Sequence, residues 1–360
     1  MSRPAAGPPR SGQQSAHAEP LRIGVLGAAR IAERAIVAPS RATGDRLVAV
    51  AARQRDRAAA FAARFGFEQV LDTYTDVVTA PDVELVYNPL ANALHGPWNL
   101  AAVRAGKHVL SEKPFAANAS EAREVRDAAR AAGVVALEGF HYLFHPVILR
   151  AHEILASGEI GELRHVEALT RMPAPADDDP RWSLDLAGGS LMDLGCYGLH
   201  AHRMLGAFAG GHPELVRARG GERAGRPGVD EWMDAEFAFP SGATGRSLSH
   251  MADDWCMTLR LVGSTGELTV ADYVQPHKDD RVIVTSGAGT RTEELGKRSS
   301  YCYQLEAVRA HLREGRPLPI DIDDAVETAE LIDAIYVAAG FEPRPASGGT
   351  DRPAPGQPAL

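Results

Sequence analysis

The chain has 360 residues, of which 45% are hydrophobic and 24% are charged, and its formal net charge is −9. This length predicts two domains rather than one. The composition is typical of a soluble globular protein, and the negative charge argues against nucleic acid or an anionic membrane as the main partner.

The two ends of the chain and its cysteines predict disordered termini and a cytoplasmic location. Residues 1–20 are rich in Pro, Ala, Ser and Gln and lack the apolar segment of a signal peptide, so we expect a disordered arm. Residues 343–360 have the same composition and predict a disordered tail. The sequence contains no run of about 18 apolar residues, so it predicts no membrane span. Cys196, Cys256 and Cys302 are odd in number and far apart, which favours reduced thiols in the cytoplasm.

Short apolar runs alternate with helical segments over residues 21–140, the predicted first domain. The predicted strands are 21–27, 47–51, 69–71, 83–88, 108–111 and 134–138. The predicted helices are 31–40, 56–65, 95–105 and 120–132, the last with Ser120 as its N-cap. This alternation predicts a doubly wound parallel sheet of the Rossmann type. Ligands bind such sheets beyond the carboxyl ends of the strands, and the residues at or just beyond these ends are Gly27, Arg53, Pro89, Glu112 and Glu138.

The pattern changes in the second predicted domain, residues 141–342. After a helix at 147–156 come short strands at 163–169, 232–239, 245–250, 256–262, 266–271 and 282–284, separated by Gly, Pro and Asp clusters. This pattern indicates an α+β domain with a large, mostly antiparallel open sheet. Two helices, 301–313 and 323–339, close the chain, and the last helix, taken as 323–340, is a candidate to pack back on the first domain.

The turn after the first strand resembles a dinucleotide-binding turn. Counted from Gly27, the G-x-G-x-x-G/A pattern has Ala29 at its middle place and Ala32 at its last. The middle alanine departs from the pattern, and the motif alone is equally compatible with a plain strand-to-helix turn. The second strand leads to Arg53 and not to an Asp or Glu, which favours NADP over NAD unless this arginine is only a solvated surface charge.

Two further segments carry side chains suited to proton chemistry. Glu112 and Lys113 end the fifth strand at the expected crevice, where an ammonium can favour the ionised form of a hydroxyl, although a surface lysine is the commoner outcome. Asp193, Tyr197 and His200 recur at helical spacing and share a face. Tyr197 is either a residue of the core or an acid/base whose pKa Lys113 lowers from about 10. Asp193 can orient either group or a substrate hydroxyl.

Several other residues are candidate ligands. His141 and Tyr142 follow the sixth strand and are candidates to line the pocket, and His200 is a candidate substrate contact. The pairs formed by His141 with His145 and by His200 with His202 have no carboxylate or cysteine beside them, so we expect no metal site. Trp232 and Trp255 are interpreted as core or sheet residues.

Taken together, these segments resemble the glucose–fructose oxidoreductase/inositol dehydrogenase/rhizopine-catabolism (Gfo/Idh/MocA) family over residues 21–343. The stretches that carry the likeness are 24–32, 51–53, 87–95, 111–114, 138–146 and 188–203, followed by the closing helices. Tyr197 stands where inositol-dehydrogenase-like members have histidine. Tyrosine at this position is similar to the branch of dihydrodiol dehydrogenases, sugar 3-ketoreductases and xylose dehydrogenases, which also shares the departure at Ala29.

The resemblance implies roles for particular residues. Lys113 and Tyr197 would be the catalytic lysine and general acid/base, and Asp193 would be the substrate-site aspartate. Arg53 would contact the 2′-phosphate of NADP. Arg181 and Trp182 look like a segment that closes over the nicotinamide. The positions that would line the dinucleotide are Gly27, Ala29, Arg30, Ile31, Pro89, Asn92, His95, Glu112 and Lys113.

The sequence therefore predicts an oxidoreductase that transfers a hydride between NADP, or less favourably NAD, and a sugar, polyol, keto-sugar or diol. Two alternatives remain: an NAD-dependent glycosidase of the same fold and a dinucleotide-binding sugar sensor without chemistry. The family likeness also implies a homodimer or homotetramer that pairs through the open sheet.

Overall fold

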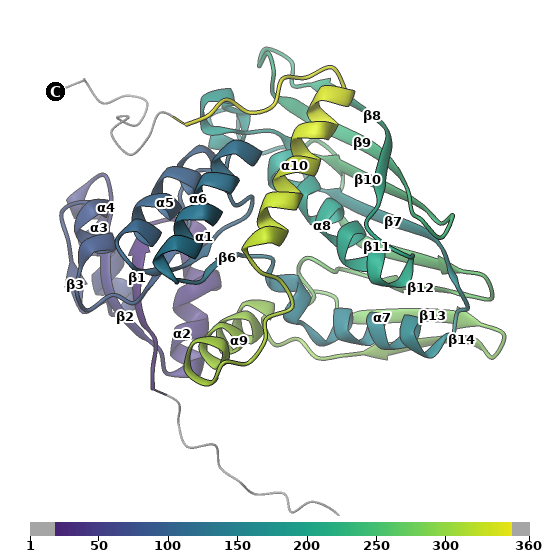
Figure 1. Cartoon of the computed structure of the whole chain (residues 1–360), viewed down its shortest axis with the longest axis horizontal. Coiled ribbons are helices and arrows are strands. Elements are labelled where there is room, and N and C mark those ends of the chain that lie inside the picture. Colours follow the sequence, from purple (N-terminus) through teal and green to yellow (C-terminus); the bar gives the residue numbers. More distant parts are fainter. Residues whose placement is uncertain (1–18, 348–360) are drawn as a thin grey trace, which may run out of the picture.

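The fold is described from a computed structural model in which residues 19–347 are placed (Figure 1). The predicted N-terminal arm, 1–20, lies outside the described residues except for its last two. Most of the predicted tail, 343–360, also lies outside them. The part of this tail that is described is not free of contacts, because Arg344 is buried and forms an ion pair with Asp230. The chain is therefore packed beyond the point where the composition predicted disorder.

The first domain is a six-stranded parallel sheet in the order β3-β2-β1-β4-β5-β6. Its strands are β1 (Arg22–Leu26), β2 (Arg46–Ala51), β3 (Gln69–Val70), β4 (Leu85–Asn88), β5 (His108–Ser111) and β6 (Ala136–Glu138). Strands β1, β2, β4 and β5 are buried along almost their whole length, as parallel strands covered on both faces must be. The order reverses beside β1, so a crevice opens where its carboxyl end meets that of β4.

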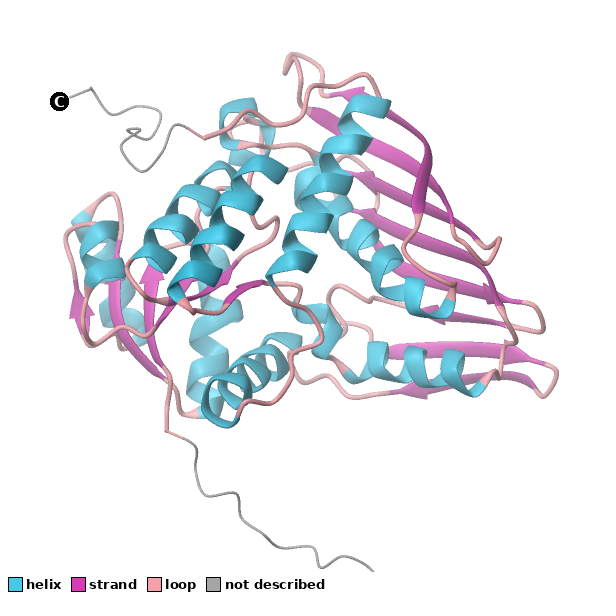
Figure 2. Cartoon of the chain, viewed as in Figure 1, coloured by secondary structure: helices cyan, strands magenta, loops and turns pink. Residues whose placement is uncertain are grey.

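Helices cover both faces of this sheet (Figure 2). They are α1 (Arg30–Ala32), which continues through a π-helical turn into α2 (Ala38–Thr43), and then α3 (Arg55–Phe65), α4 (Tyr74–Thr79), α5 (His95–Arg104) and α6 (Ala119–Ala132). Helix α4 was not predicted, although Thr73 and Asp76 form a capping box at its start. The predicted cap of α6 was wrong by two residues, because the side chain of Asn118, and not that of Ser120, accepts the Glu121 N–H.

The second domain is built on an eight-stranded sheet in the order β14-β13-β12-β11-β7-β10-β9-β8. Its strands are β7 (Leu163–Arg171), β8 (Glu214–Glu222), β9 (Asp230–Ala238), β10 (Thr244–His250), β11 (Cys256–Gly263), β12 (Glu267–Val270), β13 (Arg281–Ser286) and β14 (Gly289–Glu294). Only β7 and β10 pair in parallel among these strands. The predicted fold class is thus confirmed. The edge strands β8 and β14 were missed because they are largely exposed and lack an apolar alternation.

Three helices lie on one face of the large sheet: α7 (Pro146–Ser157), α8 (Cys196–Leu205) and α10 (Ile322–Ala338) (Figures 1 and 2). Helix α9 (Ser300–Glu314) packs instead against α2 of the first domain. Helix α8 approaches the sheet closely at Gly198, where a Cβ atom would meet Ser247 Oγ at 2.2 Å. Helix α10 contacts both α6 and α8. The Asp333 carboxylate accepts the Ala119 N–H at the start of α6. This packing fixes α8, which carries Tyr197, against the edge of the Rossmann sheet.

Candidate active site

A cavity of about 580 Å³ lies where the carboxyl edge of the first sheet meets α8 and the large sheet. Most of the predicted site residues line it: Ala29, Arg30, Ile31, Pro89, Asn92, His95, Glu112, Lys113, His141, Arg181, Asp193 and Tyr197. Five predicted residues do not line it: Gly27, Arg53, Tyr142, Trp182 and His200. A single cleft therefore collects residues from both domains.

The glycine turn has the backbone that a dinucleotide needs. Gly27 has φ +87°, a conformation that L side chains rarely adopt, and a Cβ atom there would lie 3.0 Å from Leu90 Cδ2. Ala29 has an ordinary extended backbone, with φ −80° and ψ 143°. The middle alanine of the pattern is therefore free of backbone strain. The turn also retains the tight bend that the first glycine provides.

Lys113 and Asp193 come together across the cleft from positions 80 residues apart. Lys113 Nζ donates to the Asp193 carbonyl oxygen at 2.5 Å and to its Oδ1 at 3.2 Å. Arg181 Nε donates to the other carboxylate oxygen at 2.7 Å. Burial alone would raise the pKa of Asp193, but Lys113 and Arg181 hold it below its usual range. Burial alone would likewise lower the pKa of Lys113, but Asp193 raises it, so both groups are charged.

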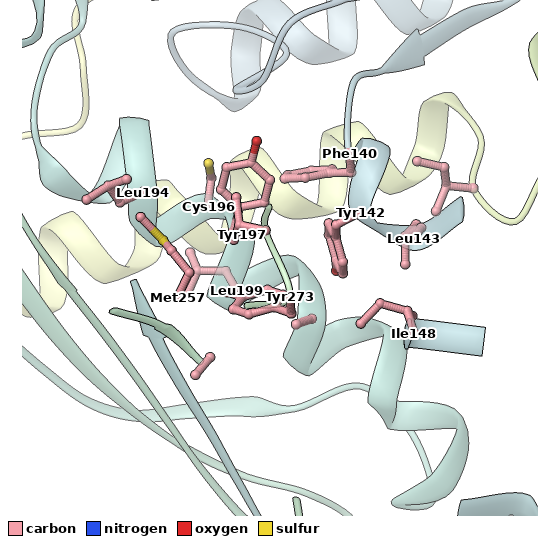
Figure 3. Packing of buried hydrophobic residues seen from close by; sticks show 14 of the residues in the cluster. Phe140, Tyr142, Leu143, Ile148, Leu194, Cys196, Tyr197, Leu199, Met257 and Tyr273 are labelled. Atoms are coloured by element: carbon pink, nitrogen blue, oxygen red, sulfur yellow. The ribbon is translucent and has the colours of Figure 1, made fainter. Parts of the chain in front are cut away.

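Tyr197 stands beside this pair with its ring in a packed cluster (Figure 3). Phe140 lies edge-on to the ring at 5.6 Å, and Lys113 Nζ lies over it, 5.0 Å from the ring centre. The Tyr197 hydroxyl forms a hydrogen bond with His141 Nε2, at 3.1 Å. Burial raises the pKa of Tyr197 well above 10. The expectation that Lys113 lowers this pKa is therefore contradicted, because the lysine hydrogen-bonds Asp193 and not the phenol oxygen.

Glu112 and His95 support the floor of the cleft. Tyr87 donates its hydroxyl to Glu112 Oε1 at 2.7 Å, and burial raises the pKa of this carboxyl. His95 lies between the carbonyls of Pro114 and Leu90, at 2.6 and 2.9 Å. Burial lowers the pKa of His95 to about 4, so the neutral ring can donate to only one of these two carbonyls.

Tyr142 and His200, both predicted to touch substrate, lie beneath the cleft and away from it. The Tyr142 hydroxyl donates to His200 Nδ1 at 2.7 Å, and His200 Nε2 lies 2.9 Å from an Asp324 carboxylate oxygen. Both side chains are buried, and each polar atom has a protein partner. The helical face shared with Asp193 and Tyr197 thus turns away from the cleft at His200. Asp193 lies in the π-helical turn Leu191–Gly195, whereas His200 lies in the regular helix α8, so the expected spacing along one face is not kept. The prediction that Tyr142 and His200 touch substrate is therefore corrected: both belong to a supporting hydrogen-bond network with Asp324.

Trp182 and Arg53 also lie outside the cleft lining. Trp182 is buried, and the guanidinium of Arg223 stacks on its ring at 4.8 Å. Arg53 follows β2 and is exposed, with no carboxylate partner among residues 19–347. Arg57 donates to the carbonyl of Ala28 at 3.3 Å, in the glycine turn itself. Arg57 was not predicted as a site residue, since helical periodicity alone assigns it to a solvent-exposed face.

The outer wall of the cleft comes from residues that the sequence analysis did not assign to the site. Trp255 precedes β11 and is 43% exposed, and Lys278 Nζ lies 4.1 Å from the centre of its ring. Gln275 and His277 line the same wall. The interpretation of Trp255 as a core or sheet residue was therefore wrong. An exposed tryptophan in a cleft is a platform on which the apolar face of a ring compound can stack.

Three further features concern the cysteines, metal ligands and helices of the described chain. Cys196, Cys256 and Cys302 are free thiols. Within residues 19–347, no group of three or more His, Cys, Asp or Glu side chains is arranged to hold a metal ion. No helix in the same range is long and apolar enough to cross a bilayer.

A Rossmann sheet with a buried lysine–aspartate pair and a tyrosine at its carboxyl edge defines a nucleotide-binding oxidoreductase. Comparison with known proteins agrees with this class. Residues 21–140 match the family described as "Oxidoreductase family, NAD-binding Rossmann fold", and residues 148–269 match the GFO/IDH/MocA C-terminal domain. The chain belongs to the Gfo/Idh/MocA oxidoreductase family, which confirms the resemblance seen in the sequence.

Individual relatives span nearly the whole chain. The NADP(+)-dependent D-xylose 1-dehydrogenase 2 of Haloferax volcanii is 33% identical, over 89% of this chain and 97% of the relative. The dTDP-3,4-didehydro-2,6-dideoxy-α-D-glucose 3-reductase of Actinomadura kijaniata is 31% identical, over 91% and 98%. The crystal structure of a 3-ketoreductase from A. kijaniata with NADP and TDP-benzene superposes with a TM-score of 0.82 at 30% identity, and covers 89% of this chain and 98% of its own.

Proposed function

We propose that the protein is an NADP-dependent oxidoreductase that interconverts a hydroxyl and a carbonyl group on a sugar, polyol, keto-sugar or diol. The convergence of Lys113, Asp193 and Tyr197 on one cleft beside the dinucleotide turn carries this proposal. The named relatives, a xylose dehydrogenase and a sugar 3-ketoreductase, support it.

The residues present fit a dinucleotide. Gly27 provides the tight turn of the phosphate-binding loop, and Arg53 and Arg57 provide positive charge where a 2′-phosphate would lie. When bound, NADP supplies or accepts the hydride. Ala29, Arg30, Ile31, Pro89, Asn92, His95, Glu112 and Arg181 are proposed to line the cofactor. Trp182 is proposed to support this wall from behind, through its neighbour Arg181.

The chain's own residues position the substrate and move its proton. Lys113 has three N–H donors, and two are held by Asp193, so the third can reach a substrate oxygen. Tyr197 is neutral because burial raises its pKa, and it can donate a proton to a carbonyl oxygen in reduction. Asp193 holds Lys113 and Arg181 in place and leaves its carboxylate edge for a second substrate hydroxyl.

A redox assay tests the function. The purified protein is titrated with NADPH and NADH, and absorbance of the reduced nicotinamide is then followed with a panel of aldoses, polyols and keto-sugars. We expect NADPH binding and turnover on at least one compound. Binding without net cofactor consumption would support a glycosidase or a sensor instead, and absence of dinucleotide binding would refute the proposal.

Removing the charge at Arg53 should change cofactor choice. We expect Arg53→Ala to weaken NADPH binding about 10- to 100-fold, because a charge-assisted bond to phosphate is lost, and to leave NADH binding within twofold. Quenching of protein fluorescence gives both dissociation constants. Arg41→Ala is the matched control, since Arg41 donates to the Phe65 carbonyl away from the turn. Equal losses for both cofactors would contradict this role.

We further propose that the protein works in the cytoplasm as a homodimer or homotetramer. The three free thiols support a reducing compartment. Leu169, Leu248 and Thr258 are neighbours on the sheet face opposite the helices, and all three are half-buried. A second copy that pairs through this face would cover them. Light scattering should give a dimer or tetramer, and Leu248→Glu should shift it to monomer. A monomeric wild-type protein would refute the assembly.

A further inference from the structure

The hydroxyl of Tyr197 is linked to a short chain of polar groups that leads away from the substrate space. Its oxygen lies 3.1 Å from His141 Nε2, and His141 Nδ1 lies 2.7 Å from Ser300 Oγ. His141 precedes α7 in a 3-10 turn, and Ser300 begins α9, so three separate segments form this chain. The imidazole is also held against Tyr301, with ring centres 3.8 Å apart.

The hydrogen bonds of His141 indicate which of its two ring nitrogens carries the proton. Among the described residues, His141 Nε2 is the partner of the Tyr197 hydroxyl, so this nitrogen must accept for the phenol proton to be satisfied. His141 Nδ1 then carries the ring proton and donates it to Ser300 Oγ. In the opposite tautomer, the phenol proton would have no acceptor among residues 19–347.

The surroundings of His141 keep it a neutral acceptor. The cationic groups that act on it are Lys113 and Arg34, and the titratable imidazoles near it are His145 and His277. Burial and these groups lower the pKa of His141 well below 6.5. The remaining neighbours are the Ser300 hydroxyl and the rings of Tyr197 and Tyr301. His141 also lines the cleft, which gives its proton a route to solvent after product leaves.

We propose that His141 is the positioning residue that takes the Tyr197 proton when Tyr197 removes the proton of a substrate hydroxyl. This step rests on the proposed function. The substrate O–H bond breaks as a new O–H bond forms on Tyr197, and the original Tyr197 O–H bond breaks as an N–H bond forms at His141 Nε2. The electron pair of the substrate C–H bond leaves as the hydride, for which oxidised NADP would be the acceptor, and the electron pair of the broken substrate O–H bond forms the carbonyl. In reduction, the same two protons move in the opposite direction.

This arrangement resolves a difficulty with Tyr197 as a base. Burial keeps its phenol protonated, and Lys113 is engaged with Asp193 instead of with the phenol oxygen. A neutral phenol can accept a substrate proton only if it gives up its own at the same time. His141 is the group in position to receive it.

Nuclear magnetic resonance of ¹⁵N-histidine-labelled protein tests the geometry without any turnover. We expect His141, assigned by its loss in His141→Gln, to be neutral at pH 7 with the proton on Nδ1. We also expect the Nε2 resonance to move in Tyr197→Phe. A proton on Nε2 or a cationic ring would refute the proposal, even if the protein proves to be a different enzyme.

Kinetics of His141→Gln test the role. Glutamine can accept the phenol hydrogen bond but cannot take the proton, so we expect kcat for oxidation to fall about 100-fold with KM and NADPH binding within threefold. When kcat is measured in mixtures of H₂O and D₂O, its dependence on the deuterium fraction should indicate two transferred protons for the wild type and one for the variant. His152→Gln, on α7 and outside this cleft, should keep the wild-type rate and the two-proton dependence.

Ser300→Ala provides a second variant if His141→Gln does not fold. Loss of the Nδ1 partner should populate the other tautomer and lower kcat several-fold, with KM unchanged. If either variant retains the wild-type rate and the two-proton dependence, His141 has only a structural role and the proposal is overturned.

Discussion

Replacing Tyr197 with phenylalanine should lower kcat about 1000-fold in both reaction directions, the middle of the range for loss of a general acid or base. The ring stays in its packed cluster beside Phe140, so the fold should be retained (Figure 3). NADPH binding should remain within twofold, because the hydroxyl faces His141 and the substrate space and not the glycine turn. Steady-state kinetics and fluorescence titration measure both quantities.

Tyr142→Phe is the matched control for this variant. It removes a hydroxyl from a neighbouring buried tyrosine, but this hydroxyl is bonded to His200 beneath the cleft. We expect Tyr142→Phe to lower the free energy of unfolding by about 1–3 kcal/mol, because His200 Nδ1 loses its donor. Its kcat should be unchanged. If Tyr197→Phe kept kcat within twofold of wild type, Tyr197 would not be the acid/base.

Lys113→Met should lower kcat/KM by about 100- to 10,000-fold, because a buried charge beside the reacting oxygen is lost. Methionine fills a similar volume and keeps the apolar stem. The Asp193 carboxylate would keep only Arg181 as its cation, so its pKa should rise toward the usual range. We therefore expect an added loss of activity as the pH falls that the wild-type enzyme does not show. Rates measured between about pH 4 and pH 7 test this.

Lys107→Met is the matched control for Lys113→Met, because it also removes a partly buried lysine, but one outside the cleft. Lys107 is half-buried and donates to the carbonyls of Ala80 and Val83, both at 2.7 Å and remote from the cleft. This control should lower the melting temperature and leave kcat unchanged. If both lysine variants lost only stability, or if Lys113→Met kept wild-type turnover, the assignment of Lys113 to the reaction would be refuted.

The pattern of apolar residues and short motifs was sufficient to predict the Rossmann fold and most of the residues that line the cleft. Apolar runs such as Leu85–Asn88 identify buried strands directly. Where a helix of 10–14 residues connects two such strands, the strands are expected to pair in parallel. Lys113 and Arg53 follow strand ends, so their placement near one edge follows from topology. Strands β8 and β14 and helix α4 escaped prediction because exposed edges and short helices carry little periodicity.

The polar partners inside the site required the tertiary structure. The sequence gives no sign that Lys113 would bond to Asp193 and not to Tyr197, since the two candidates lie on the same helical segment. Nor does it indicate that Trp255, which stands beside a strand of the other domain, would reach the cleft.

The sequence by itself determined the family and the fold class and supplied the candidates for the chemistry, because each depends on short motifs and on the periodicity of neighbouring residues. Only the tertiary structure decided which of those residues meet. It buried Tyr142 and His200 in a supporting network and placed His141 against the Tyr197 hydroxyl. The physical reason is that hydrogen bonds extend over about 3 Å. Whether two side chains reach that distance depends on how α8, α9 and the large sheet pack, which no local pattern encodes.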